Sequence, residues 1–221
     1  MQTPAERKLI EVLRHFVARH QGQQAELLNI GAGKSLVIEN HLIEGGGRLV
    51  CDRVDIADCQ VQHPTVRHCY RCSVESMGPV CSDSYDAAFS NYLLEHVVDL
   101  DKAASEIARV LRPGGLYVAS VPNPKAVEFA VARCTPFWFH KLVRGGPTWP
   151  TCYAYDSVEH LCRVFEGVGF RTVGVHHYSC LQQYTRRLPG FGALGALYDW
   201  GVETVGWKRC MGNVCIVFCN V

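Results

Sequence analysis

Short apolar runs alternate along the chain with longer segments whose apolar residues recur every three to four positions. The short runs predict β-strands at residues 26–30, 49–55, 66–70, 85–90, 115–121, 171–177 and 213–219. The longer segments predict helices between these strands. This alternation is typical of a mostly parallel sheet with helices on both faces, so the expected fold class is α/β, doubly wound.

The first helix is predicted from a capping box, Thr3-Pro4-Ala5-Glu6, in which Thr3 accepts from the first-turn amides and Glu6 reaches back. Its apolar residues fall on one face at helical spacing: Leu9, Ile10, Leu13, Phe16 and Val17. We expect a helix that covers a core or a cleft. A basic amphipathic membrane anchor is the alternative interpretation.

Further helix signals lie later in the chain. A helix over 101–111 is expected to end at Pro113-Gly114-Gly115, since proline cannot continue it. A second capping box, Asp156-Ser157-Val158-Glu159, predicts another helix that stops at Gly169. Residues 184–211 are expected to be helical only in part, because five glycines interrupt them.

Composition narrows the class of protein. With 22 Lys and Arg against 21 Asp and Glu, the chain has no general attraction for nucleic acid or anionic membranes. Its 221 residues predict one soluble domain, and charges interrupt the helical segments too often for a bilayer span. The first residues lack a secretory pattern, so we expect a cytoplasmic protein with reduced cysteines. Cys69 and Cys72 have no second ligand pair at zinc-finger distance, so no metal is expected.

A glycine-rich turn follows the first predicted strand: Gly31-Ala32-Gly33-Lys34-Ser35. A phosphate-binding loop would need glycine at Leu28, and a dinucleotide fingerprint would need it at Leu36. A tight turn without any ligand remains an alternative. The pattern favours a ligand that carries adenosine but no pyrophosphate, such as S-adenosylmethionine.

Asp55 closes the second predicted strand, 24 residues after Gly31. A carboxylate near this distance is placed to accept hydrogen bonds from the two ribose hydroxyls of a nucleotide. The alternative is that Asp55 only caps a helix start.

Two longer stretches resemble a known family. They are Asp83-Ser84-Tyr85-Asp86-Ala87-Ala88-Phe89-Ser90-Asn91-Tyr92-Leu93-Leu94-Glu95-His96-Val97 and Ala108-Arg109-Val110-Leu111-Arg112-Pro113-Gly114-Gly115. With the glycine turn and Asp55 they resemble the class I S-adenosylmethionine-dependent methyltransferases, including the ubiquinone-pathway O-methyltransferases, over residues 24–122. The resemblance implies a Rossmann-like seven-stranded sheet whose last strand is antiparallel.

The resemblance also implies a set of cofactor contacts. The methionine part of the cofactor would lie over the turn, its ribose at Asp55 and its adenine on Ile56. The remaining contacts would come from Asn29, Gly31, Ala32, Gly33, Ser73, Val74 and Asn91. Asn29 and Ser73 stand where relatives usually carry carboxylates, so each loses a charge-assisted hydrogen bond worth about 1 kcal/mol or more.

Methyl transfer from a sulfonium is an in-line displacement that needs a well-placed acceptor and, for weakly acidic acceptors, a base. His96 is the candidate base because its ordinary pKa is near 6.5. A histidine bonded only to its own turn is the alternative, and Glu95 is equally ambiguous.

The resemblance implies an acceptor pocket built from an N-terminal helix at residues 1–22 and an insertion at 122–155, and the rest of residues 1–221 would complete one domain. Candidate substrate contacts are Tyr92, Trp138, His140, Tyr153 and Tyr155. Ordinary packing of these aromatic residues is the alternative.

The expected function is methyl transfer from S-adenosyl-L-methionine to a small molecule, preferably to oxygen and then to nitrogen, with S-adenosyl-L-homocysteine as product. The alternatives are an NAD(P)-dependent oxidoreductase and a non-catalytic S-adenosylmethionine-binding module. We expect a monomer or homodimer without nucleic acid or stable membrane insertion.

Overall fold

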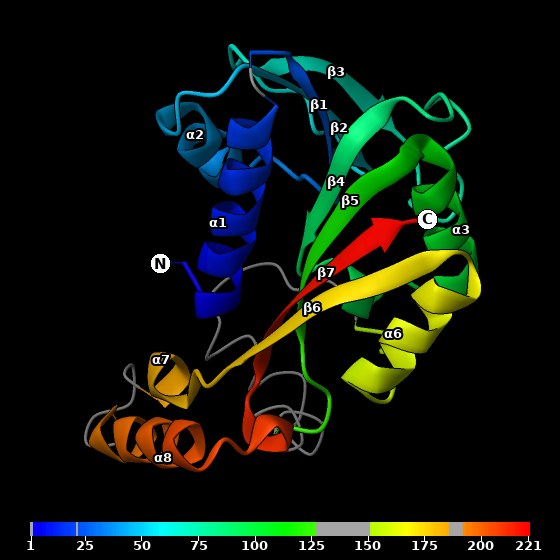
Figure 1. Cartoon of the computed structure of the whole chain (residues 1–221). Helices are drawn as coiled ribbons and strands as arrows, with labels where there is room; N and C mark the ends of the chain where they lie inside the picture. Colours follow the sequence, from blue (N-terminus) through cyan, green and yellow to red (C-terminus); the bar gives the residue numbers. More distant parts are fainter. Residues whose placement is uncertain (1, 21, 127–150, 186–191) are drawn as a thin grey trace.

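The computed structural model describes residues 2–20, 22–126, 151–185 and 192–221 (Figure 1). Within them a single sheet holds seven strands in the order β3-β2-β1-β4-β5-β7-β6. The strands are β1 (Ala25–Ile30), β2 (Leu49–Asp55), β3 (Val66–Arg71), β4 (Tyr85–Asn91), β5 (Leu111–Pro122), β6 (Phe170–Tyr178) and β7 (Asn213–Asn220). Every strand expected from the apolar runs is present.

Strand direction follows the expected Rossmann-like plan. β3, β2, β1, β4 and β5 pair in parallel, and β7 runs antiparallel between β5 and β6. Because the chain order reverses between β1 and β4, the carboxyl ends of these two strands flank the position where such sheets bind ligands.

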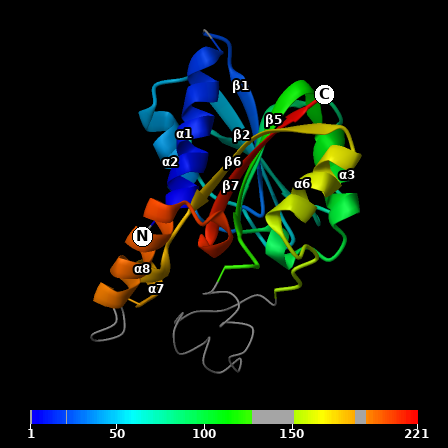
Figure 2. The same ribbon diagram turned by 60° about the horizontal axis from the view of Figure 1, so that its bottom comes forward.

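Helices cover both faces of the sheet (Figures 1 and 2). α1 (Pro4–Arg19) and α2 (Val37–Glu44) lie on one face, and α3 (Leu100–Val110) and α6 (Val158–Gly167) lie on the other. Short η1 (Leu94–His96) and η2 (Lys208–Cys210) complete the connections. α7 (Leu181–Thr185) and α8 (Gly192–Val205) pack on each other beyond the end of the sheet, so the stretch 184–211 is helical in part, as expected.

The capping box at Thr3 is confirmed. Thr3 accepts from the Glu6 amide, and the Glu6 carboxylate accepts from the Thr3 amide. Leu9 and Leu13 are fully buried against the sheet. The membrane-anchor interpretation of this helix is therefore wrong, because its apolar face is already used in the core.

Two predicted helix ends need correction. The N-cap of α6 is Ser157, whose side chain accepts from the His160 amide, and not Asp156. α3 ends at Val110, and Leu111 is already extended as the first residue of β5. Ser157 is the extended residue directly before α6, so its side chain, and not that of Asp156, is within reach of the first-turn amides.

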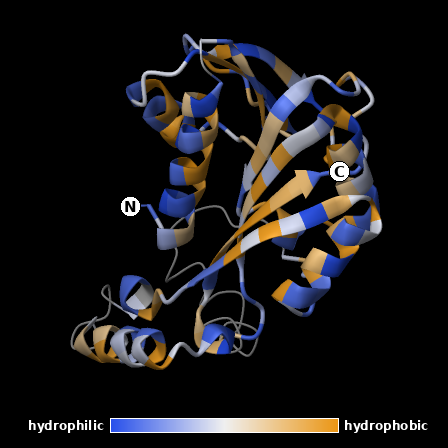
Figure 3. Ribbon diagram, viewed as in Figure 1, coloured by the Kyte–Doolittle hydropathy of each residue, from blue (hydrophilic) through white to orange (hydrophobic). Residues whose placement is uncertain are grey.

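The core has an aromatic centre on the α3 and α6 side. Tyr117, Phe165 and Phe218 stack at 4.6–6.0 Å between ring centroids, and Phe170 packs at an angle to them. Apolar residues run along β7 between its neighbours (Figure 3). This cluster anchors the antiparallel half of the sheet.

Candidate functional site

The glycine turn follows β1 directly. Gly31 and Gly33 have φ of 72° and 53°, a backbone conformation that suits glycine. A Cβ on Gly31 would lie 2.8 Å from the Cδ1 of Leu93, so a side chain would also clash there. A Cβ on Gly33 would meet nothing within 4 Å. The turn therefore exposes bare backbone to open space at Gly33.

Asp55 lies at the carboxyl end of β2 and holds this turn. Its Oδ2 accepts from the Gly33 amide at 2.8 Å, and its Oδ1 accepts from the Ala57 amide at 2.8 Å. No helix is present in the stretch 56–65 that follows, so the helix-cap interpretation is wrong. Each carboxylate oxygen keeps a second lone pair with which to accept from a ligand hydroxyl.

A cavity of about 120 Å³ opens beside Asp55. It collects residues from the ends of β1 and β2, from the loop after β3 and from η1 and its flanks. The lining residues are Ile30, Gly31, Val54, Asp55, Ile56, Cys72, Ser73, Val74, Glu75, Leu93, His96 and Val97. Five of the expected cofactor residues and the candidate base thus face one cavity.

The charges around the cavity have one sign. Asp55 and Glu75 supply carboxylates, and no Lys or Arg is among the described lining residues. Glu75 Oε1 accepts from the amides of Val98 and Asp99 at 2.8 and 3.0 Å, which fixes it as an acceptor. Such a lining favours a ligand with positive charge over a pyrophosphate.

Comparison with known proteins points to one family. Residues 28–119 match the family model described as a methyltransferase domain. Over residues 28–119 the chain is thus similar to methyltransferase domains.

Two curated relatives show how far this similarity extends. A protein named "Probable S-adenosylmethionine-dependent methyltransferase" from Mycolicibacterium smegmatis is 30% identical over 131 residues, 57% of this chain and 49% of its own length. The mitochondrial ubiquinone biosynthesis O-methyltransferase of Homo sapiens is 26% identical over 157 residues, 67% of this chain and 42% of its own. The chain thus spans about half the length of these curated relatives.

A solved structure has a similar fold. The geranyl diphosphate C-methyltransferase from Streptomyces coelicolor A3(2), in complex with Mg²⁺, geranyl diphosphate and S-adenosyl-L-homocysteine, has a TM-score of 0.58 and 16% identity to this chain. The match covers 98% of this chain and 81% of that one. At this identity the likeness shows the fold.

Four expected cofactor residues lie outside the cavity lining: Ala32 and Gly33 of the turn, and the two amides Asn29 and Asn91. Asn29 is buried and donates to Glu39 Oε1 at 2.8 Å. The Asn91 side chain accepts from the Ser120 hydroxyl. Both amide side chains are thus engaged with the protein. The contact expected of Asn91 with the cofactor is through its backbone carbonyl, and this contact and that of Asn29 stay predictions.

His96 ends the short η1 and is half-buried at the cavity wall. Its Nε2 lies 4.0 Å from Glu95 Oε1, and its backbone amide donates to Leu93. The imidazole therefore reaches the cavity from the carboxyl side of β4, where an acceptor could approach it.

The expected substrate contacts separate into three groups. Tyr155 is a core residue whose hydroxyl donates to the Pro122 carbonyl at 3.1 Å, and its expected role as a substrate contact stays a prediction. Tyr153, with φ of 44°, packs beside the core and donates its amide to the Glu95 carbonyl. Tyr92, with φ of 54°, donates its hydroxyl to Asn213 and is hydrogen-bonded to the Thr3 hydroxyl at the start of α1. Trp138 and His140 lie outside the described residues.

Sequence reasoning missed Leu93 and Glu75 as parts of the site. Leu93 packs on Gly31, and Glu75 follows directly on the expected Ser73 and Val74. Leu93 stands inside a stretch that carries the family resemblance, and Glu75 is next to two expected cofactor residues. Only contacts between distant segments show which side chains face the ligand space.

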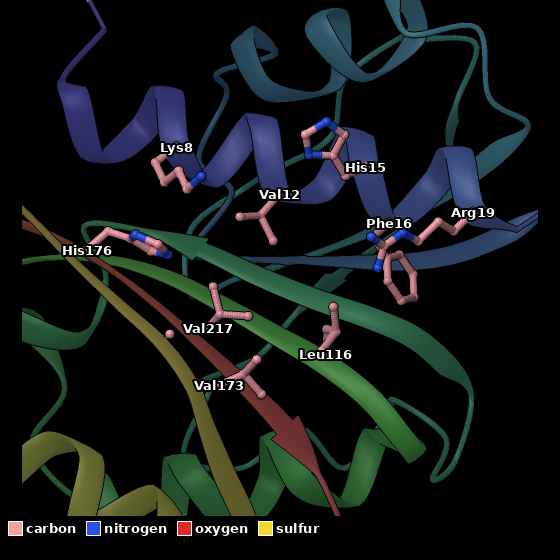
Figure 4. A pocket seen from close by; sticks show the side chains of 10 residues that line it. Lys8, Val12, His15, Phe16, Arg19, Leu116, Val173, His176 and Val217 are labelled. Atoms are coloured by element: carbon pink, nitrogen blue, oxygen red, sulfur yellow. The ribbon is translucent and has the colours of Figure 1, made fainter.

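A second hollow, of about 370 Å³, lies between α1 and the outer strands (Figure 4). It is lined by Lys8, Val12, His15, Phe16, Arg19, Leu116, Val173, Gly174, His176 and Val217, and it shares no residue with the cavity beside Asp55. Its lining residues come from α1, β5, β6 and β7. In the part of the chain that the structure describes, no helix has the length and apolarity that crossing a membrane requires.

Proposed function

We propose that this chain transfers a methyl group from S-adenosylmethionine to an oxygen atom, or less favourably a nitrogen atom, of a small molecule. The observation that carries the proposal is the cavity in which Asp55, the loop at Ser73 and His96 converge from three separate parts of the chain. One wall suits a nucleoside, and another offers a proton acceptor beside it.

The residues present fit the cofactor. Asp55 has lone pairs left for the ribose hydroxyls, and the Gly33 backbone borders open space. Ile56 is 57% exposed beside them and can pack on an adenine face. At about 120 Å³ the cavity encloses only part of the cofactor, since whole-ligand pockets measure roughly 300–1,000 Å³. The rest would lie along the exposed turn.

The cofactor supplies an activated methyl group on a sulfonium sulfur. The glycine turn and Asp55 would hold the nucleoside end, which leaves the acceptor to be placed roughly 3–3.5 Å from the methyl carbon on the side away from sulfur. We assign His96 to take the proton from the acceptor, because it is the histidine among the described cavity residues.

Support for oxygen as acceptor comes from the ubiquinone O-methyltransferase relative of Homo sapiens. The acceptor side of the site would include Tyr92 and Tyr153, which lie near the ends of β4 and of the insertion 122–155. The cytoplasmic location and the monomeric or dimeric state expected from the sequence remain predictions.

An NAD(P)-dependent oxidoreductase is the second candidate. The two carboxylates of the cavity disfavour it, since a diphosphate beside Asp55 and Glu75 would be repelled. A non-catalytic cofactor-binding module would bind the same ligand without turnover.

Titration calorimetry with S-adenosylhomocysteine and with NADH distinguishes these candidates. We expect binding of S-adenosylhomocysteine and none of NADH. A panel of phenols, catechols and amines with radiolabelled S-adenosylmethionine then tests turnover. Binding of NADH alone would overturn the proposal, and cofactor binding without a methylated product from any acceptor would favour the binding module.

A further inference from the structure

The buried residue Arg53 holds the glycine turn from below. It lies in β2, two residues before Asp55, and its side chain has no solvent exposure. We propose that Arg53 is a positioning residue for cofactor binding: it sets the conformation of the turn, and Glu39 holds its guanidinium in place. This inference rests on the proposed function, because it concerns how the same cofactor site is assembled.

One nitrogen of Arg53 reaches three carbonyls of the turn. Its Nη2 donates to the carbonyls of Ala32 at 2.9 Å, Gly33 at 3.2 Å and Ser35 at 2.9 Å. A turn whose carbonyls converge on one cation has its amides directed the other way. That leaves the Gly33 amide free to donate to Asp55, as observed at 2.8 Å.

The other end of the guanidinium is anchored to α2. Arg53 Nη1 donates to Glu39 Oε1 at 2.6 Å, and the Asn29 amide donates to the same oxygen at 2.8 Å. Glu39 is 1% exposed. The network therefore ties β1, β2 and the first turn of α2 to the loop between β1 and α2.

A gain in stability alone does not explain the buried ion pair of Arg53 and Glu39. Taking two charges out of water costs several kcal/mol per ion, and apolar replacements of buried pairs are often neutral or stabilising. The pair is also incompletely bonded, since Glu39 Oε2 and Arg53 Nε have no hydrogen-bond partner among the described residues. The pair orients the glycine turn: the turn carbonyls point toward Arg53, and the Gly33 amide points toward Asp55.

Residues 53 and 55 face the turn together, because alternate residues of a strand point to the same face. Arg53 bonds the carbonyls of the turn and Asp55 bonds its amide. The turn is thereby held with positive φ at Gly31 and Gly33 before any ligand arrives. Pre-organisation of this kind raises affinity because the ligand does not have to order the loop.

The test compares Arg53→Met, Arg53→Lys and Glu39→Gln with a matched control, Arg109→Met. Arg109 has the same chemistry at another loop: it pairs with Glu106 and donates to the carbonyls of Met77 and Val80. Two quantities are measured on folded protein, below the midpoint of each melting curve. They are the Kd for S-adenosylhomocysteine by calorimetry and amide exchange of the peptide 31–36 by mass spectrometry.

We expect Arg53→Met to raise the Kd by at least about ten-fold and to speed exchange of the 31–36 peptide. Arg53→Lys and Glu39→Gln should lie between it and the wild type, because each keeps part of the network. Arg109→Met should lower the melting temperature while it leaves the Kd and the exchange of this peptide unchanged.

A folded Arg53→Met protein with wild-type Kd and wild-type exchange at 31–36 would overturn the proposal. If Arg53→Met does not fold, Arg53→Lys and Glu39→Gln decide by the same two measurements. If the wild type itself binds no S-adenosylhomocysteine, the proposed function fails, and exchange at 31–36 in the ligand-free variants still tests whether Arg53 orders the turn.

Discussion

Asp55 both holds the glycine turn in place and lines the cavity. Its two oxygens accept from the backbone on either side, at Gly33 and Ala57, while the carboxylate lines the cavity. A residue of this kind cannot be replaced by one that supplies only volume, because both its geometry and its charge are in use.

Asp55→Ala is therefore expected to weaken S-adenosylhomocysteine binding by about 2 kcal/mol, roughly 30-fold, through loss of charged hydrogen bonds. Asp58→Ala is the control, since Asp58 is exposed and pairs with Lys34. Calorimetry measures both. Equal affinity of the Asp55 variant and the wild type would show that Asp55 does not hold the ribose.

For His96 we expect a different effect from that of Asp55, because a base acts on turnover rather than on cofactor affinity. His96→Gln should lower kcat by about 10²–10⁴-fold with the acceptor identified from the panel. Its Kd for S-adenosylhomocysteine should equal that of the wild type. A parallel loss of both quantities would place His96 in cofactor binding, and no loss of either would remove it from the site.

At the scale of elements, the start of α6 separates two neighbouring polar residues. Ser157 accepts from the His160 amide at 3.1 Å, whereas Asp156 makes no such cap. Ser157→Ala should cost about 1 kcal/mol of unfolding free energy, the usual value for a lost N-cap. Asp156→Ala should cost clearly less. Urea unfolding of the two variants measures the difference, and equal losses would contradict the assignment of the cap.

β6 carries a pH-sensitive residue, His177. Burial, and then the charge of Lys208, lowers the pKa of His177 below its usual value, and its Nδ1 has no hydrogen-bond partner among the described residues. Below about pH 6.5 the unfolded chain therefore binds a proton here that the folded chain resists. The sign is fixed by this difference: stability falls as pH falls.

Between pH 7.5 and pH 5.5, His177→Gln should lose less melting temperature than the wild type, because glutamine does not titrate. His41→Gln, at a more exposed histidine on α2, is the control and should follow the wild type. Differential scanning fluorimetry across this pH range measures all three. An identical pH dependence of the His177 variant and the wild type would contradict the argument.

For the whole molecule, the aromatic centre between β5, β7 and α6 is a closely packed part of the core, and a cavity there should be costly. Phe165 is fully buried and its ring lies 4.6 Å from that of Phe218. Phe165→Ala should cost about 3–5 kcal/mol of unfolding free energy. Leu197→Ala, at a residue of α8 that is 64% exposed, should change it by less than about 0.5 kcal/mol. Urea unfolding tests both, and a small loss for Phe165→Ala would mean that the cluster can collapse around the gap.

The strands were predictable because their apolar runs are short, buried and bounded by turns. β2 was placed at 49–55, its observed range, from seven residues that read as a buried strand. The start of β5 was placed too late, since Leu111 already pairs with Tyr85 of β4, before a register shift, although this stretch resembles a helix end. The antiparallel direction of β7 came from the family resemblance, because an apolar run carries no sign of direction.

Some residues of the site were likewise predictable from the sequence, and others were not. Gly31, Gly33 and Asp55 were found from the sequence because their roles depend on backbone freedom and on position at a strand end, both of which are local properties. Tyr155 could not be placed from the sequence, because an aromatic residue in a polar neighbourhood suits a core and a binding site equally. Its burial and its hydrogen bond to Pro122 come from the tertiary structure alone.

The amino-acid sequence by itself determined the order of strands and helices, the glycine turn and the carboxylate that follows β2, because each depends on neighbours along the chain. The tertiary structure alone decided that Arg53 and Glu39 lie beneath that turn, that Leu93 packs on Gly31 and that His96 faces the same cavity as Asp55. These contacts join residues 10 or more positions apart through the strand order β2-β1-β4. The local sequence around these side chains does not indicate that the strand order will bring them together.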